Sequence, residues 1–203
     1  MKKSFTDYKL IGGILLAYIL IYVSFDNNGV FWYLYTATML FLISIAILSE
    51  KMEDEASSQK YFIFGLLSGI SLYILFFAGD WLFSLLPGSF DKQITKVYSL
   101  FSFKWIWHYL VLFFIIIPGE EIFWRGFVQK RLTRYMDIKV AILIAATLNA
   151  AAYILSGFTI LIIAAFISGI VWGSLYVWKR SMPLIIISHL IFDLLLLIIW
   201  PLG

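Results

Sequence analysis

The sequence predicts an all-α protein, a polytopic transmembrane helix bundle of about seven spans with an additional interfacial helix. Three observations support this prediction. Hydrophobic residues make up 63% of the 203 residues and mean hydropathy is +0.95, well above the roughly 45–50% apolar content of soluble domains. Only 13% of the residues are charged. Apolar stretches of about 20 residues, the length needed to cross about 30 Å of hydrocarbon, follow one another along the chain.

The apolar stretches are joined by short polar connections. The apolar stretches cover residues 9–25, 30–49, 61–86, 104–118, 138–155, 158–178 and 182–202, and the fourth continues into a charged motif. The first stretch lacks a small-residue cleavage pattern after it, so we expect a retained span and not a signal peptide. No linker rich in Pro, Ser or charge divides the chain, which predicts a single membrane domain over residues 1–203.

Two connections have a distinctive composition. Residues 87–103 contain spaced aromatic and apolar positions, which predicts a helix resting in the membrane interface. Residues 50–60, EKMEDEASSQK, are rich in charge, and we expect a solvated connector there. The absence of cysteine excludes disulfides and sulfur-ligated metals.

The distribution of basic residues predicts the orientation. With the N-terminus in the cytoplasm, every Lys and Arg lies inside except Lys92, Lys96 and Lys104, and the positive-inside rule favours that arrangement. We therefore expect a multi-pass protein of the cell membrane with a cytoplasmic N-terminus and an external C-terminus.

Ionisable residues follow the fourth apolar stretch directly, in IIIPGEEIFWRGFVQKRL at residues 115–132. Charges at membrane depth cost roughly 2.5–3.5 kcal/mol each, so they normally face a bundle interior and a partner. Glu121 and Arg125 are four residues apart and can form an ion pair on one helix face. Glu120 points about 100° away and is predicted to be an unpaired carboxylate able to take a proton from water. A helix end at the interface, with its acids complementing the helix dipole, is the alternative.

A second polar group occurs in the last apolar stretch, IIISHLIFDLLLLIIW. His189 and Asp193 are four residues apart, hence on one helix face, and together at membrane depth they indicate a functional site. Asn149 and Tyr153 show the same spacing, and they either face this site or form hydrogen bonds between helices. We expect these side chains and Glu120 to share one polar pocket.

The order and spacing of these motifs resemble the CAAX protease and bacteriocin-processing (CPBP or Abi) family of intramembrane proteases. The resemblance covers about residues 104–200, a CPBP-like catalytic core. It is carried by EEIFWR, the following GF and basic helix, the glycine-bearing FISGIVWGSLY and the final HLIFD.

The resemblance implies roles for individual residues in a water-filled membrane cavity. Glu120 would activate water, His189 and Asp193 would stabilise the oxyanion, and Glu121 with Arg125 would brace the site. The family's mechanism depends on glutamate and uses no metal, so no cofactor is expected.

The sequence departs from the family pattern at the second motif, Phe-x-x-x-His, where NAAAY supplies Asn149 and Tyr153. Either Glu120 works alone with Tyr153 orienting the water, or catalysis is lost and the pocket is kept. Many relatives have Asn in place of Asp193. An ionised Asp would repel an oxyanion, so we expect Asp193 to orient His189.

Two functions from different classes follow from this pattern. The first is an intramembrane glutamate-type endopeptidase that cleaves a hydrophobic peptide or membrane-protein substrate. The alternative is a catalytically weak family member acting as a membrane scaffold or bacteriocin-immunity protein. A metal held by Glu120, His189 and Asp193 is least favoured, because the chain has no His-Glu-x-x-His pattern and only two histidines. The lipid bilayer is the other expected partner, nucleic acid is not one, and no oligomeric state is predicted.

Overall fold

The computed structural model describes residues 7–84 and 91–202, and every regular element within them is a helix. Seven helical segments of this part of the chain are long and apolar enough to cross a membrane, which confirms the predicted all-α bundle. Lys2, Lys3, residues 85–86 of the predicted third span and residues 87–90 of the predicted interfacial connection lie outside the described residues.

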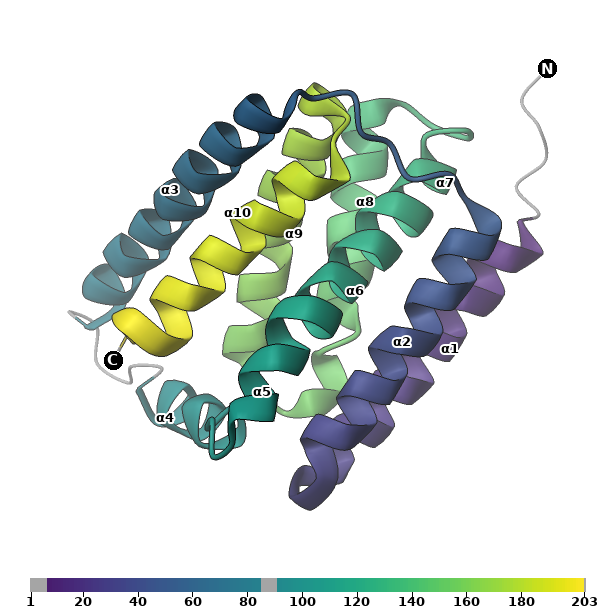
Figure 1. Cartoon of the computed structure of the whole chain (residues 1–203). Coiled ribbons are helices and arrows are strands. Elements are labelled where there is room, and N and C mark those ends of the chain that lie inside the picture. The colour runs from purple at the N-terminus through teal and green to yellow at the C-terminus, as the bar shows by residue number, and fades with distance from the viewer. Residues whose placement is uncertain (1–6, 85–90, 203) are drawn as a thin grey trace.

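The spans form a bundle in which the fourth span lies between two outer pairs of helices (Figure 1). One outer pair is α1 and α2, and the other is α3 and α10. The helices are α1 (Tyr8–Asp26), α2 (Phe31–Ser49), α3 (Ser58–Ser84), α4 (Asp91–Leu100), α5 (Ile106–Val111), α6 (Ile117–Glu121), α7 (Lys130–Leu132), α8 (Ile138–Ala151), α9 (Thr159–Lys179) and α10 (Met182–Leu194). α5, α6 and α7 form one continuous span, because π-helical turns at Leu112–Ile116 and Ile122–Gln129 join them.

Glycines on α3 allow its backbone to lie almost against α10. A Cβ atom added at Gly65 would lie 2.8 Å from Ile187 Cγ2, and one at Gly69 would lie 2.5 Å from the Ser188 carbonyl oxygen. Small residues permit this kind of close helix approach in membranes. Because Ser188 precedes His189, the α3 contact supports the part of α10 that carries the histidine.

Pro118 and Gly119 shape the middle of the fourth span. Proline has no N–H and cannot continue the regular helical bonding, and the turn before it is widened, with the Ile117 N–H bonded to the Leu112 carbonyl. A Cβ atom at Gly119 would lie 2.9 Å from Met39 Cβ. α2 therefore packs directly on the helix that carries the two glutamates.

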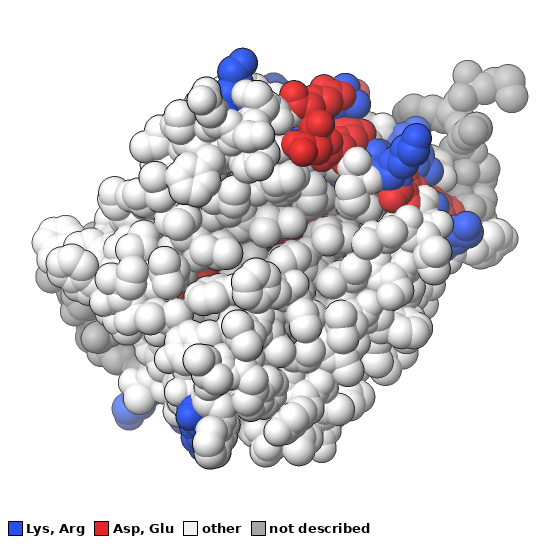
Figure 2. All heavy atoms as spheres, in the orientation of Figure 1, with Lys and Arg blue, Asp and Glu red and all other residues white. Residues whose placement is uncertain are grey.

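The acidic connection between α2 and α3 is mostly exposed, as expected of a solvated connector, and its acidic residues also bind other segments. Glu50 forms an ion pair with Arg131 at 3.0 Å. Glu53 pairs with Lys130 at 2.9 Å and with Arg180 at 3.0 Å. Figure 2 shows these opposite charges gathered at one end of the bundle, above a mostly uncharged band. The partners come from distant segments, so local composition did not reveal them.

The predicted interfacial helix corresponds to α4, which crosses the opposite end of the bundle near the C-terminus (Figure 1). The Tyr98 hydroxyl donates to the Leu196 carbonyl at 3.0 Å and accepts from the Leu202 N–H at 2.8 Å. These bonds attach α4 to the end of the last span, so this helix covers the end of the bundle.

Candidate active site

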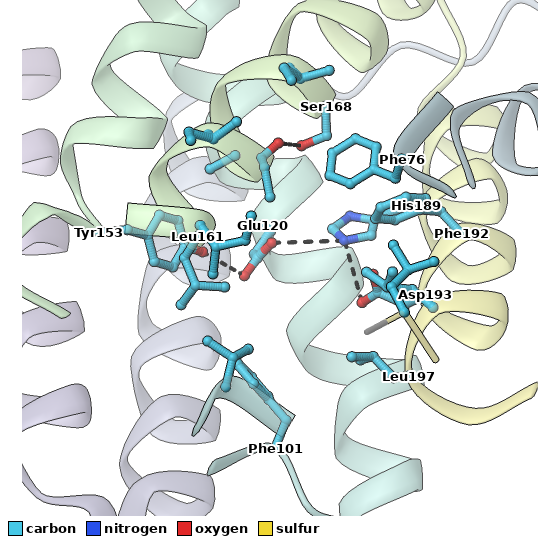
Figure 3. A pocket seen from close by; sticks show the side chains of 18 of the residues that line it. Phe76, Phe101, Glu120, Tyr153, Leu161, Ser168, His189, Phe192, Asp193 and Leu197 are labelled. Atoms are coloured by element: carbon cyan, nitrogen blue, oxygen red, sulfur yellow. Dashed lines mark hydrogen bonds and ion pairs between the residues drawn. The ribbon is translucent and has the colours of Figure 1, made fainter. Parts of the chain in front are cut away.

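A cavity of about 360 Å³ opens between α3, α4, the fourth span, α9 and α10. Its wall is mostly apolar, but Glu120, Tyr153, His189 and Asp193 all line it. Figure 3 shows Glu120 and Tyr153 on one side and His189 and Asp193 facing them. The structure therefore brings four of the predicted site residues, from three spans, to one cavity.

Glu120 is held through one of its two carboxylate oxygens. Oε1 accepts a hydrogen bond from the Tyr35 hydroxyl at 2.6 Å and another from the Tyr153 hydroxyl at 3.1 Å. The two tyrosine oxygens are themselves 2.9 Å apart. The expectation of an unpaired Glu120 is therefore wrong, because the hydroxyls of Tyr35 and Tyr153 bind its carboxylate. Oε2 is left facing His189 Nε2 at 4.0 Å.

Glu121 connects Arg125 to His189. Its Oε1 atom lies 3.1 Å from Arg125 Nη1 and 2.8 Å from His189 Nδ1, so the predicted ion pair is present with an additional partner. A carboxylate only accepts hydrogen bonds, so Nδ1 of His189 carries the proton. The other ring nitrogen, Nε2, is thereby directed towards Glu120.

Asp193 and Asn149 both line the cavity, as expected, but neither makes the close contact that orients His189. Asp193 Oδ2 lies 3.6 Å from His189 Nε2, so the close contact that orients the imidazole comes from Glu121. Asn149 is buried on the cavity wall one turn before Tyr153. Its Oδ1 atom has no hydrogen-bond partner among the described residues. Asn149 is thus near the site but outside its hydrogen-bond network.

This arrangement coincides with a family match over residues 102–195, to the family described as Type II CAAX prenyl endopeptidase Rce1-like. That family is part of the CAAX protease and bacteriocin-processing group, as the motifs predicted. Residues 102–195 therefore resemble a CPBP-family domain. With its seven apolar spans, the chain is a multi-pass membrane protein. A search of curated proteins and a search of solved structures give no match.

The candidate site includes a residue from outside the matched region. Tyr35 belongs to α2, whereas the match begins at residue 102. No spacing signal links a tyrosine of the second span to a glutamate of the fourth. The close packing of Met39 on Gly119 places α2 beside Glu120, and this contact is visible only in the tertiary structure.

Trp172 of α9 is the second contributor that sequence reasoning missed. Its ring stacks on the His189 imidazole with centroids 3.9 Å apart and planes 23° apart. Its Nε1 donates to Ser188 Oγ at 3.1 Å, and the Arg125 guanidinium lies 5.3 Å from its ring centroid. The indole therefore fixes the ring plane of His189, while Glu121 fixes its rotation.

Metal binding was the least favoured prediction for this site. Among residues 7–84 and 91–202, no group of three or more His, Asp and Glu side chains is placed to hold a metal ion. The contacts described above are hydrogen bonds and ion pairs between protein side chains.

Proposed function

We propose that this protein is an intramembrane endopeptidase in which Glu120 is the general base. The supporting observation is that the two carboxylate oxygens have different partners. Oε1 is bound by two tyrosines, and Oε2 faces His189 Nε2 at 4.0 Å. A water molecule can lie at a hydrogen-bonding distance of about 2.8 Å from both atoms. That position adjoins the cavity in which a peptide would bind.

The proposed reaction uses only side chains of the protein. Glu120 takes a proton from the water as the water oxygen bonds to the peptide carbonyl carbon, and the carbonyl electron pair moves onto oxygen. Protonated His189 donates a hydrogen bond from Nε2 to this oxyanion, and Asp193 balances the imidazolium charge. Glu120 then gives its proton to the amide nitrogen, the oxyanion electron pair re-forms the C=O bond and the C–N bond breaks, which yields a carboxylic acid and an amine. No cofactor is required for these steps.

The substrate class and the orientation are part of the same proposal. The apolar cavity wall suits a hydrophobic peptide or a segment of a membrane protein. We place the protein in the cell membrane with its N-terminus in the cytoplasm and its C-terminus outside. The concentration of Lys and Arg at the N-terminal end of the bundle supports this orientation (Figure 2).

A membrane scaffold or bacteriocin-immunity protein is the second candidate. The observation that favours it is Tyr153, which replaces the histidine of the second family motif and hydrogen-bonds to Glu120 itself. A tyrosine hydroxyl has a pKa near 10 in water, so it is a poor base at neutral pH. In this alternative the cavity binds a hydrophobic partner without cleaving it.

The test is a comparison of wild type with Glu120→Gln in native membranes, with peptides and membrane proteins analysed by mass spectrometry. The amide oxygen of Gln can still accept from both tyrosines, so we expect the variant to fold. Uncleaved substrates should accumulate in Glu120→Gln and not in Glu55→Gln, which changes a surface carboxylate that is 57% exposed. A cellular phenotype and peptide profile unaffected by Glu120→Gln would favour the scaffold.

A further inference from the structure

The active-site cavity is negatively charged. Its described wall contains three carboxylates, those of Asp80, Glu120 and Asp193, and one histidine, with no Lys or Arg. When all three carboxylates are ionised, a protonated His189 neutralises only one of them. Charges act over longer distances beside an apolar protein wall than in bulk water. The wall therefore attracts cations and repels anions.

Asp80 is the acid of this wall that has no partner of its own. It lies near the end of α3 and is partly buried. Among the described residues, its carboxylate forms no hydrogen bond or ion pair. By comparison, Glu120 is bound by Tyr35 and Tyr153, and Asp193 lies 3.6 Å from the imidazole of His189.

Two tyrosine hydroxyls that interact electrostatically with Asp80, those of Tyr73 and Tyr98, are already bonded to other groups. The Tyr73 hydroxyl donates to the Trp200 carbonyl at 2.8 Å, and the Tyr98 hydroxyl donates to the Leu196 carbonyl at 3.0 Å. A hydroxyl has only one proton to donate, so neither serves Asp80.

We propose that Asp80 recognises a positively charged group on the substrate, so that the preferred substrate is an apolar peptide carrying a lysine, an arginine or a free amino terminus. This inference rests on the endopeptidase function proposed above. A partly buried carboxylate without a hydrogen-bond partner is costly, and an ammonium or guanidinium group supplies both the missing charge and the missing hydrogen bonds. A free carboxylate beside Asp80 is repelled, so a peptide presenting its C-terminus there binds weakly.

The position of Asp80 determines which part of the substrate carries the charge. Tyr98 of α4 and Leu202 also line the cavity, so Asp80 lies towards the end of the bundle where α4 meets the C-terminus. Glu120 is in the middle of the fourth span. The charged group therefore binds on the α4 side of the scissile bond.

The experiment uses the full-length protein in lipid nanodiscs and a leucine-rich octapeptide series. Lys, norleucine or Glu is placed in turn at each position, and both cleavage and competitive binding are measured. For at least one position, wild type should prefer Lys over norleucine by about tenfold, which corresponds to about 1.4 kcal/mol, and should bind the Glu peptide least. Asp80→Asn should abolish this preference and Asp80→Lys should reverse it in favour of Glu. Asp26→Asn is the matched control, because Asp26 is exposed at the end of α1 and is absent from the cavity wall, and it should retain the wild-type preference.

The outcomes separate this inference from the proposed function. If Glu120→Gln abolishes cleavage but wild type treats the three peptides alike, charge recognition is wrong and the endopeptidase stands. A preference that persists in Asp80→Asn also overturns the role of Asp80. If no peptide is cleaved but the Lys peptide binds best in an Asp80-dependent manner, the recognition stands and the endopeptidase fails. The wild-type peptide series tests the charge preference even if a substitution at Asp80 prevents folding.

Discussion

Replacing Glu121 by Gln should destabilise the protein strongly. The Glu121 side chain is fully buried and its Oε1 atom binds both Arg125 and His189. The substitution leaves Arg125, whose side chain is only 3% exposed, without its counter-charge. Nη2 of Arg125 already has no hydrogen-bond partner among the described residues. The contact of Arg125 with the Trp172 ring is present in wild type and should be kept in Glu121→Gln, so it does not offset the loss of the ion pair.

The expected size of this effect follows from the burial of the pair. Removing one partner of a buried ion pair costs about 3–5 kcal/mol. At about 2–4 °C per kcal/mol for a chain of this size, Tm should fall by about 6–20 °C. Thermal unfolding of the detergent-solubilised protein, followed by tryptophan fluorescence, measures this change.

Glu120→Gln is the matched control for that experiment. The Glu120 side chain is 16% exposed, and an amide oxygen can still accept from Tyr35 and Tyr153, so the loss should stay below about 1.5 kcal/mol. The double variant Glu121→Gln/Arg125→Met should recover stability relative to Glu121→Gln, because replacing both members of a buried pair is often neutral. Equal destabilisation by the two glutamine variants, or no recovery in the double variant, would refute this reasoning.

Three further predictions concern the site, the charged end and the topology. Tyr35→Phe should lower kcat more than Tyr153→Phe, because it removes the shorter hydrogen bond to Glu120. Tyr153→His should retain or raise activity. Peptide cleavage assays test these variants, and unchanged rates in both Phe variants would contradict the role of the tyrosines. Hydrogen bonding from Arg180 lowers the pKa of Glu53 below its ordinary value of 4.5, with burial opposing and Lys130 assisting. The resulting stabilisation is present above pH 4.5 and is lost as pH falls through the lowered pKa, so the Tm difference between wild type and Glu53→Gln should shrink from pH 7 to about pH 3. Reporter fusions at the two termini should report opposite sides of the membrane, and a signal from the same side at both ends would exclude seven spans.

The sequence by itself predicted the apolar spans and their helical type, and it supplied most of the polar residues that line the cavity. Span length and hydropathy predict membrane helices because the bilayer sets both the length and the polarity of a segment that crosses it. The spacing of Glu121 and Arg125 predicted their ion pair, because residues four apart share one helix face. The spacing of His189 and Asp193 placed them on one face for the same reason. These conclusions depend on local geometry, which is encoded along a single segment.

Only the tertiary structure decided which partners these residues have in space. Tyr35 reaches Glu120 because Gly119 lets Met39 of α2 pack on the fourth span, and the second partner of Glu121 is His189, 68 positions along the chain. Contacts between distant segments depend on how helices pack, and packing leaves no periodic signal in either segment. Local spacing therefore showed which residues were available for a polar site, and the packing of distant helices decided which of them bind one another.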